Sequence, residues 1–252
     1  MEYGLKGKVV LVTGAGSQIG FGKAISLAFA KEGCDIIVDD IDLEGAQKTG
    51  AEVEALGRKV LVIKADVANE GEVNGMVKSA LATFGRVDIL VNNAGTVFRS
   101  PFHLTTDKDW DINIGINLKG TWLCTRAVLP NMLERKSGKI INLSSVTGRT
   151  GQGTPLYAAA KAGVSGLTKG LANEVGPFGI NVNAIAPGMA DTGFQIAARV
   201  PPEAKLRFAQ TVPMRRMNVP KDIADMTLFL ASDMASGITG QTFNVDCGSN
   251  MP

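Results

Sequence analysis

The chain has 252 residues, of which 45% are hydrophobic and 20% are charged, as in an ordinary globular protein. Its 26 lysines and arginines nearly balance its 24 aspartates and glutamates, and no basic run occurs, so the composition argues against nucleic-acid binding. No stretch approaches the roughly 18 uninterrupted apolar residues of a membrane span, and the first residues lack a signal-peptide pattern. We therefore expect a cytoplasmic protein with neither nucleic-acid nor membrane partners.

Cysteine and histidine are too few and too dispersed to build a metal site or a disulfide framework. Cys34, Cys124 and Cys247 lie far apart, which favours reduced and mostly buried thiols. The single histidine, His103, lies in a polar segment with no nucleophile motif beside it. We predict no metal site and no catalytic role for His103.

Short apolar runs alternate with helical patterns along the chain. The runs predict strands, and the periodic segments between them predict helices. Strands are expected over 8–14, 34–40, 59–67, 86–95, 138–145, 180–188 and 241–248, and helices over 20–33, 43–57, 70–85, 109–136, 157–179 and 221–233. The strands are almost continuously apolar, which is typical of a parallel sheet covered on both faces. The sequence predicts a single α/β domain over 1–252, a Rossmann-type doubly wound parallel sheet flanked by helices.

The least regular segment is 189–220, which follows the sixth expected strand. It falls at the carboxyl edge of the predicted sheet, where open α/β folds bind ligands. We predict a substrate lid there, with a plain surface excursion as the alternative.

A glycine-rich stretch, TGAGSQIG at 13–20, joins the first strand to the first helix. Glycines at such a turn let the backbone approach a pyrophosphate, and the helix N-terminus offers unpaired N–H groups. A glutamine stands at position 18, where a familiar version of the turn has glycine. The sequence alone therefore leaves open whether Gln18 breaks a dinucleotide site.

Two aspartates, Asp39 and Asp40, end the second strand about twenty residues past the turn. A carboxylate there accepts hydrogen bonds from a ribose 2′-hydroxyl and repels a 2′-phosphate. Strand alternation allows only one of the two to point at the ribose. The turn carries no lysine or arginine for a phosphate, so NAD is favoured over NADP.

The stretch YAAAK places Tyr157 and Lys161 four residues apart, on one face of a helix. A nearby ammonium lowers the pKa of a phenol from its usual value near ~10, which makes a workable acid and base. Upstream, Ser144 and Ser145 end a strand, and a hydroxyl there suits the substrate oxygen.

Together these motifs resemble the short-chain dehydrogenase/reductase family, including its 3-oxoacyl-carrier-protein reductase-like members, over nearly the whole chain. The resemblance implies Tyr157 as acid/base, Lys161 as its partner and ribose ligand, Ser145 rather than Ser144 as the catalytic serine, and Asn117 as the holder of a relay water. It also implies Asp40 rather than Asp39 as the ribose ligand. The cofactor-binding residues implied in this way are Gly14, Ser17, Gln18, Ile19, Asp40, Asp66, Val67, Asn93, Tyr157, Lys161, Pro187, Gly188 and Thr192.

The sequence departs from the family pattern TGxxxGxG at Gln18, which we interpret as a tolerated substitution. We expect its side chain to face solvent or to bond a phosphate oxygen. Its Cβ also disfavours a positive φ. Cys247 stands where the family commonly has glycine, and it bears on packing rather than chemistry.

The resemblance implies reversible hydride transfer between NAD and a secondary alcohol or ketone, in a homotetramer. The substrate contacts expected are Ser145, Gln152, Tyr157, Met189 and Phe194, with Val97, Thr147 and Phe208 nearby. Arg99 is either an anion ligand or a solvated surface residue. Two alternatives stand: a 3-oxoacyl-carrier-protein reductase of fatty acid synthesis, which Asp40 argues against, and a dinucleotide-binding protein without turnover.

Overall fold

The structure, a computed structural model, describes residues 3–190, 192 and 201–251. Its centre is one seven-stranded sheet in the order β3-β2-β1-β4-β5-β6-β7, and every neighbouring pair is parallel. The strands are β1 Val9–Thr13, β2 Asp35–Asp40, β3 Val60–Lys64, β4 Ile89–Asn92, β5 Gly138–Leu143, β6 Ile180–Pro187 and β7 Thr242–Val245. The predicted Rossmann-type doubly wound parallel sheet is confirmed.

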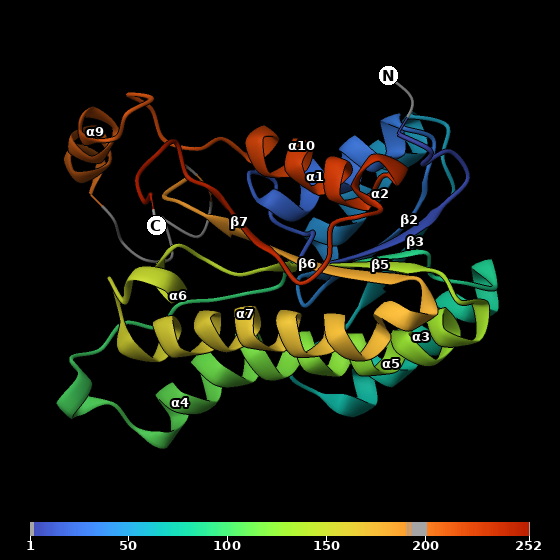
Figure 1. Ribbon diagram of the computed structural model, residues 1–252, viewed down its shortest axis with the longest axis horizontal. Coiled ribbons are helices and arrows are strands. Elements are labelled where there is room, and N and C mark those ends of the chain that lie inside the picture. Colours follow the sequence, from blue (N-terminus) through green and yellow to red (C-terminus); the bar gives the residue numbers. More distant parts are fainter. Residues whose placement is uncertain (1–2, 191, 193–200, 252) are drawn as a thin grey trace.

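Helices cover both faces of this sheet (Figure 1). One face carries α1 Phe21–Lys31, α2 Leu43–Ala55 and α10 Pro220–Ala231. The other carries α3 Glu70–Phe84, α4 Asp107–Ile114, α5 Gly120–Arg135 and α7 Pro155–Val175. Because strand side chains alternate, Ile36 and Val38 pack under α1 and α2, whereas Ile37 packs toward α3 and α5. The continuous apolar runs of the sequence therefore feed two separate cores.

The carboxyl ends of the strands all open at one edge of the molecule. Two short elements, α6 Thr147–Thr150 and α9 Pro202–Thr211, gather at that edge beside the C-terminus (Figure 1). Neither was predicted, because four residues are too few for a periodic pattern and α9 buries no side chain fully. No helix among the described residues is long and apolar enough to cross a membrane.

The long helical region expected over 109–136 is divided in the structure. A π-helical turn over 115–119 separates α4 from α5. Such turns are rare and occur often at functional sites. This one contains Asn117, a residue that the sequence singled out.

Candidate active site

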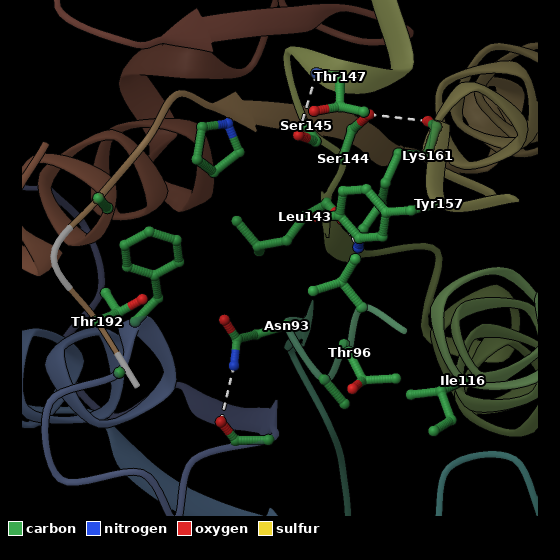
Figure 2. A pocket seen from close by; sticks show the side chains of 18 of the residues that line it. Asn93, Thr96, Ile116, Leu143, Ser144, Ser145, Thr147, Tyr157, Lys161 and Thr192 are labelled. Atoms are coloured by element: carbon green, nitrogen blue, oxygen red, sulfur yellow. Dashed lines mark hydrogen bonds between the residues drawn. The ribbon is translucent and has the colours of Figure 1, made fainter. Parts of the chain in front are cut away.

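A cavity of about 850 Å³ lies along the carboxyl edge of the sheet. This volume falls within the range of small-molecule and cofactor sites. Figure 2 shows Ser145, Tyr157 and Lys161 on one wall, and Asn93 and Thr192 farther along. Among the predicted site residues, those that line the cavity are Gly14, Ser17, Asp40, Asp66, Val67, Asn93, Ser145, Gln152, Tyr157, Lys161, Pro187, Gly188, Met189 and Thr192. One cavity therefore brings together most of the residues that the motifs selected.

The glycine turn forms the floor at one end of the cavity. Gly14 has φ +67, and a Cβ there would lie 2.7 Å from the Cα of Ala94. Gly22, in the first turn of α1, packs so closely that a Cβ would lie 2.3 Å from the carbonyl oxygen of Gly14. Gly20 caps α1 and lines the cavity together with Phe21. The glycines that shape the turn are therefore Gly14, Gly20 and Gly22, and five residues separate Gly14 from Gly20.

This arrangement corrects the expectation for Gln18 and Ile19, since neither residue lines the cavity. The family pattern has three residues after its first glycine, so Gln18 was matched to the wrong position in a turn that is two residues longer. Gly20 and Phe21 occupy the place that the sequence assigned to Gln18 and Ile19. The backbone of Gln18 also has no positive φ, so its Cβ strains nothing.

The side chain of Gln18 instead ties the turn to α2. Its amide nitrogen donates to the carbonyl oxygens of Gly16, at 2.8 Å, and Gly45, at 3.0 Å. Its amide oxygen accepts from Lys23 at 2.9 Å, and Lys23 also pairs with Glu52 at 2.6 Å. Gln18 is therefore a brace for the turn, facing α2.

We expect Gln18→Ala to lower the free energy of unfolding by about 1–2 kcal/mol, because each net hydrogen bond contributes about 1 kcal/mol. Affinity for a dinucleotide should change less than about threefold, because the side chain faces away from the cavity. Urea denaturation and calorimetric titration measure the two effects. The matched control is Gln47→Ala, an exposed glutamine on α2. Unchanged stability with a lost affinity would contradict the bracing role.

The two aspartates at the end of β2 point to opposite faces of the sheet. Asp40 lies beside the glycine turn, where its carboxylate accepts from the backbone N–H of Gly16 at 2.6 Å and of Asp42 at 2.9 Å. Asp39 is fully buried toward α3 and α5. Asp40 thus lines the cavity at the glycine turn, and its expected role as the ribose ligand stays a prediction.

Next to β2, the loop after β3 supplies the far end of the cavity. The carboxylate of Asp66 accepts from the N–H of Ala68 at 2.9 Å, and Val67 is buried against Gly120. Asn93 donates its side-chain amide to the carbonyl oxygens of Thr13 and Gly14, both at 2.8 Å (Figure 2). Asn93 therefore fixes the glycine turn against the end of β4.

Ser145 and Tyr157 lie next to each other on one wall of the cavity, with their side chains hydrogen-bonded. The backbone N–H of Thr147 donates to Ser145 Oγ at 3.1 Å, which orients the hydroxyl (Figure 2). A hydrogen bond from Ser145 lowers the pKa of Tyr157, but burial outweighs it and raises that pKa to about 12. Ser144 is turned away, bonded to the carbonyl oxygen of Lys161 and the hydroxyl of Ser165, both at 2.9 Å. The geometry therefore favours Ser145 over Ser144.

Lys161 lies under the ring of Tyr157, with its Nζ 5.7 Å from the ring centroid. It donates to the carbonyl oxygen of Leu143 at 2.7 Å, and burial lowers its pKa to about 8. The sequence predicted that this ammonium would lower the phenol pKa. In the structure burial dominates both groups, and Ser145 is the group that opposes the rise at Tyr157.

Asn117 is fully buried below the cavity and does not line it. Its amide donates to the carbonyl oxygens of Thr96 and Asn113, both at 2.8 Å. It thereby ties the π-helical turn to the segment that follows β4 and lines the cavity. Its expected role as the holder of a relay water stays a prediction.

The remaining wall comes from segments after β5 and β6. Gly188 packs so tightly that a Cβ would lie 2.7 Å from the Cβ of Asp246. The described parts of the expected lid at 189–220 contribute Met189, Thr192 and Phe208 to the cavity. Phe194, a predicted substrate contact, lies outside the described residues. The remaining lining residues expected near the substrate are Val97, Arg99, Thr147 and Gln152.

Sequence reasoning missed three features of the site. Gly20 and Phe21 could have been placed at the N-terminus of α1 by counting back along the helical pattern from Gly33, which follows the helix. The lack of hydrogen-bond partners at the carboxylate of Asp39 could not have been predicted, because nothing in its sequence context distinguishes it from Asp40. Thr154 lines the cavity with a buried hydroxyl that has no hydrogen-bond partner among the described residues.

Comparisons with known proteins identify the family of this chain. The family model described as Enoyl-(Acyl carrier protein) reductase matches residues 14–250. The (2S)-[(R)-hydroxy(phenyl)methyl]succinyl-CoA dehydrogenase subunit BbsD of Thauera aromatica is 42% identical, covering 97% of each chain. The 3-oxoacyl-acyl-carrier-protein reductase FabG of Thermotoga maritima is 40% identical over 97% of this chain and 98% of its own. The crystal structure of levodione reductase has a TM-score of 0.91 and 37% identity, covering 96% of this chain and 97% of its own. The chain belongs to the short-chain dehydrogenase/reductase family.

Proposed function

We propose that the protein interconverts a secondary alcohol and a ketone by hydride transfer with NAD(H). The observation that carries this proposal is the meeting of Ser145, Tyr157 and Lys161 on one wall of a cavity whose other end is a glycine turn. Family membership and relatives named as dehydrogenases and reductases support an oxidoreductase that acts on alcohol or ketone groups.

The residues present suit a nicotinamide dinucleotide. The closeness of Gly14 to Ala94 and of Gly22 to the turn leaves bare backbone at the N-terminus of α1, which is the environment that a pyrophosphate needs. Asp40 would bind the adenosine ribose, and Lys161 and Tyr157 the nicotinamide ribose. Gly188 and Thr192 would lie at the nicotinamide end. The bound cofactor supplies the hydride acceptor or donor.

The protein's own part of the reaction is proton transfer and positioning. Because the pKa of Tyr157 is raised to about 12, its phenol is protonated at neutral pH and donates to the carbonyl oxygen during reduction. Ser145, oriented by the N–H of Thr147, holds the same oxygen. In the oxidative direction the phenol must first lose its proton, so the oxidation rate should rise with pH.

Asp40 is the expected selector between cofactors, and NADP+ should bind at least about tenfold more weakly than NAD+, since a carboxylate repels a 2′-phosphate. Asp40→Asn should narrow that ratio, and calorimetric titration with each cofactor measures it. The matched control is Asp42→Asn, which removes the same charge two residues away and keeps a good cap on α2. Equal binding of both cofactors by the wild type would refute the selector, and binding of neither would refute the proposed function.

A second candidate, 3-oxoacyl-carrier-protein reductase, is favoured by the names of some relatives. The acidic group at Asp40 argues against its usual NADPH. Comparing a 3-oxoacyl thioester with cyclic and aromatic secondary alcohols distinguishes the two. Failure to turn over any member of that panel, with NAD+ bound, would support a non-catalytic binding protein.

We expect a cytoplasmic homotetramer, as the family resemblance implies. Trp110 on α4 and Trp122 on α5 are 52% and 42% exposed, and Arg126 lies 4.4 Å from the Trp122 ring. Such exposed aromatic residues suit an interface between subunits.

A further inference from the structure

Arg99 is a cation in the wall of the cavity that neither the fold nor the proposed reaction uses. It lines the cavity, yet among the described residues its guanidinium has no ion pair and no hydrogen bond. Two exposed arginines elsewhere in the chain do find a carboxylate, Arg126 with Glu70 and Arg216 with Asp222. An unpaired cation in a ligand cavity is a group that can fix the orientation of a charged ligand.

The backbone that leads to Arg99 is held by two asparagines one helical turn apart. Asn117 accepts from the N–H of Thr96 at 3.3 Å and donates to its carbonyl oxygen at 2.8 Å. Asn113 does the same for Phe98, at 3.3 Å and 3.4 Å. Both asparagines are fully buried, so water does not compete for these bonds. The segment before Arg99 is therefore fixed to α4 and to the π-helical turn.

This pattern of hydrogen bonds also sets the direction of the Arg99 side chain. The N–H and C=O of one residue point the same way in extended backbone, and successive side chains point to opposite sides. Val97 and Arg99 therefore share one side of the segment, and Phe98 lies on the other. In agreement, Val97 and Arg99 line the cavity, whereas Phe98 is exposed and does not line it.

Charge is unevenly distributed along the cavity. Its acids lie at the ends of β2 and β3, Asp40 and Asp66 among them, and its described cations are Arg99 and Lys161. In the sheet order β4, which precedes Arg99, is two strands from β2 and three from β3. Since neighbouring strands are about 4.8 Å apart, those acids are about 10–14 Å away, at or beyond the roughly 10 Å over which salt screens exposed charges. Lys161 already serves Leu143 and Tyr157, so the charge of Arg99 is not balanced.

The position of Arg99 suits a group on the substrate. A Cβ on Gly95 would lie 3.5 Å from the Nζ of Lys161, and the four residues from Gly95 to Arg99 span at most about 14 Å. A guanidinium is a planar fork that matches the two oxygens of a carboxylate. One such cation balances the single charge of a carboxylate but not the −1.5 to −2 or so of a phosphate monoester.

We propose that the substrate is a hydroxy or oxo carboxylic acid, and that Arg99 binds its carboxylate while Tyr157 and Ser145 hold the reacting oxygen. Arg99 then determines specificity and takes no part in the proton transfer. This inference rests on the proposed function, because it takes the catalytic wall to be the reacting end of the cavity.

The test compares each acid with its own uncharged ester. The substrates are straight-chain oxo acids from 3-oxobutanoate to 7-oxooctanoate and their methyl esters, reduced with NADH at pH 7. For at least one chain length the wild type should have a kcat/KM at least about tenfold higher for the acid than for the ester.

Arg99→Gln should remove that preference. We expect the KM for the acid to rise about tenfold to a hundredfold with little change in kcat, because the lost bonds are made equally in the ground state and the transition state. The kinetics with the ester should stay as in the wild type. Arg99→Lys should keep part of the preference, since it retains the charge without the fork. Calorimetric titration of NAD+ should give the same Kd within about threefold for all three proteins.

Arg207→Gln is the matched control, because it removes the same charge from α9 at an exposed residue that does not line the cavity, although the neighbouring Phe208 does. It should keep the wild-type preference. Equal use of acid and ester, turnover of uncharged substrates alone, or a preference that survives in Arg99→Gln would overturn this inference and leave the proposed function standing. A loss of NAD+ affinity in Arg99→Gln equal to the loss for the acid would overturn it as well, because the guanidinium would then serve the cofactor. Turnover of no alcohol, ketone, acid or ester would refute the proposed function itself.

Discussion

Tyr157→Phe should lower kcat by about a thousandfold, within the 10²–10⁴ range of general acid–base catalysis, and leave NAD+ affinity nearly unchanged. The change removes only the phenol oxygen. Burial raises the pKa of this phenol, and the hydrogen bond from Ser145 lowers it. The ring and its packing over Lys161 remain. Steady-state kinetics with an alcohol or ketone substrate, together with calorimetric titration of NAD+, separates the two effects.

Tyr3→Phe is the matched control, because it is the same substitution at a tyrosine that does not line the cavity. Tyr3 packs against the apolar core beneath α1 and α10. Tyr3→Phe should therefore retain the wild-type kcat. Turnover of Tyr157→Phe at more than about a tenth of the wild-type rate would exclude the phenol as the acid.

Asp39→Asn should stabilise the protein increasingly as the pH rises. In the folded chain the carboxyl has a pKa of about 8, compared with an ordinary value of 3.8, so the folded state keeps a proton that the unfolded state releases. The stability contributed by that proton is complete below pH 3.8 and is lost as the pH rises through 8. Asparagine does not titrate, so its advantage grows by up to about 1.4 kcal/mol per pH unit.

Between pH 5 and pH 8 the free energy of unfolding of Asp39→Asn, relative to the wild type, should therefore increase by up to about 4 kcal/mol. Urea denaturation at both pH values measures this, and the subtraction removes the titration of all other groups. Glu44→Gln, with its exposed carboxylate, should show no change in the difference. A constant difference for Asp39→Asn would mean that the carboxyl ionises in the folded protein as it does in water.

All seven strands were predictable, because each contains a short apolar run, and an inner strand such as VVLVT in β1 is buried on both faces. The neighbouring positions of Tyr157 and Lys161 were also predictable, because helical periodicity places residues four apart on one face of α7. The acid strength of Tyr157 was not, because motif spacing reveals neighbouring charges but not the depth of burial that outweighs them.

The glycine turn shows a different limit. A pattern of glycines can be matched to a known spacing in more than one register, and only the packing of Gly22 against Gly14 decides between them. The sequence likewise does not separate Asp39 from Asp40, because the two are the same residue type in adjacent positions. Asp40 is partly exposed beside the glycine turn and Asp39 is buried, because the side chains of a strand alternate between its two faces.

The brace that Gln18 forms with α2 has a consequence for how this chain can vary. The longer turn is held by side chains from two helices, Lys23 on α1 and both Thr49 and Glu52 on α2. A substitution at any one of these positions loosens the others, so homologues with the same turn length should change them as a group. Homologues with the shorter turn are free of this constraint, and their corresponding positions on α2 should drift independently.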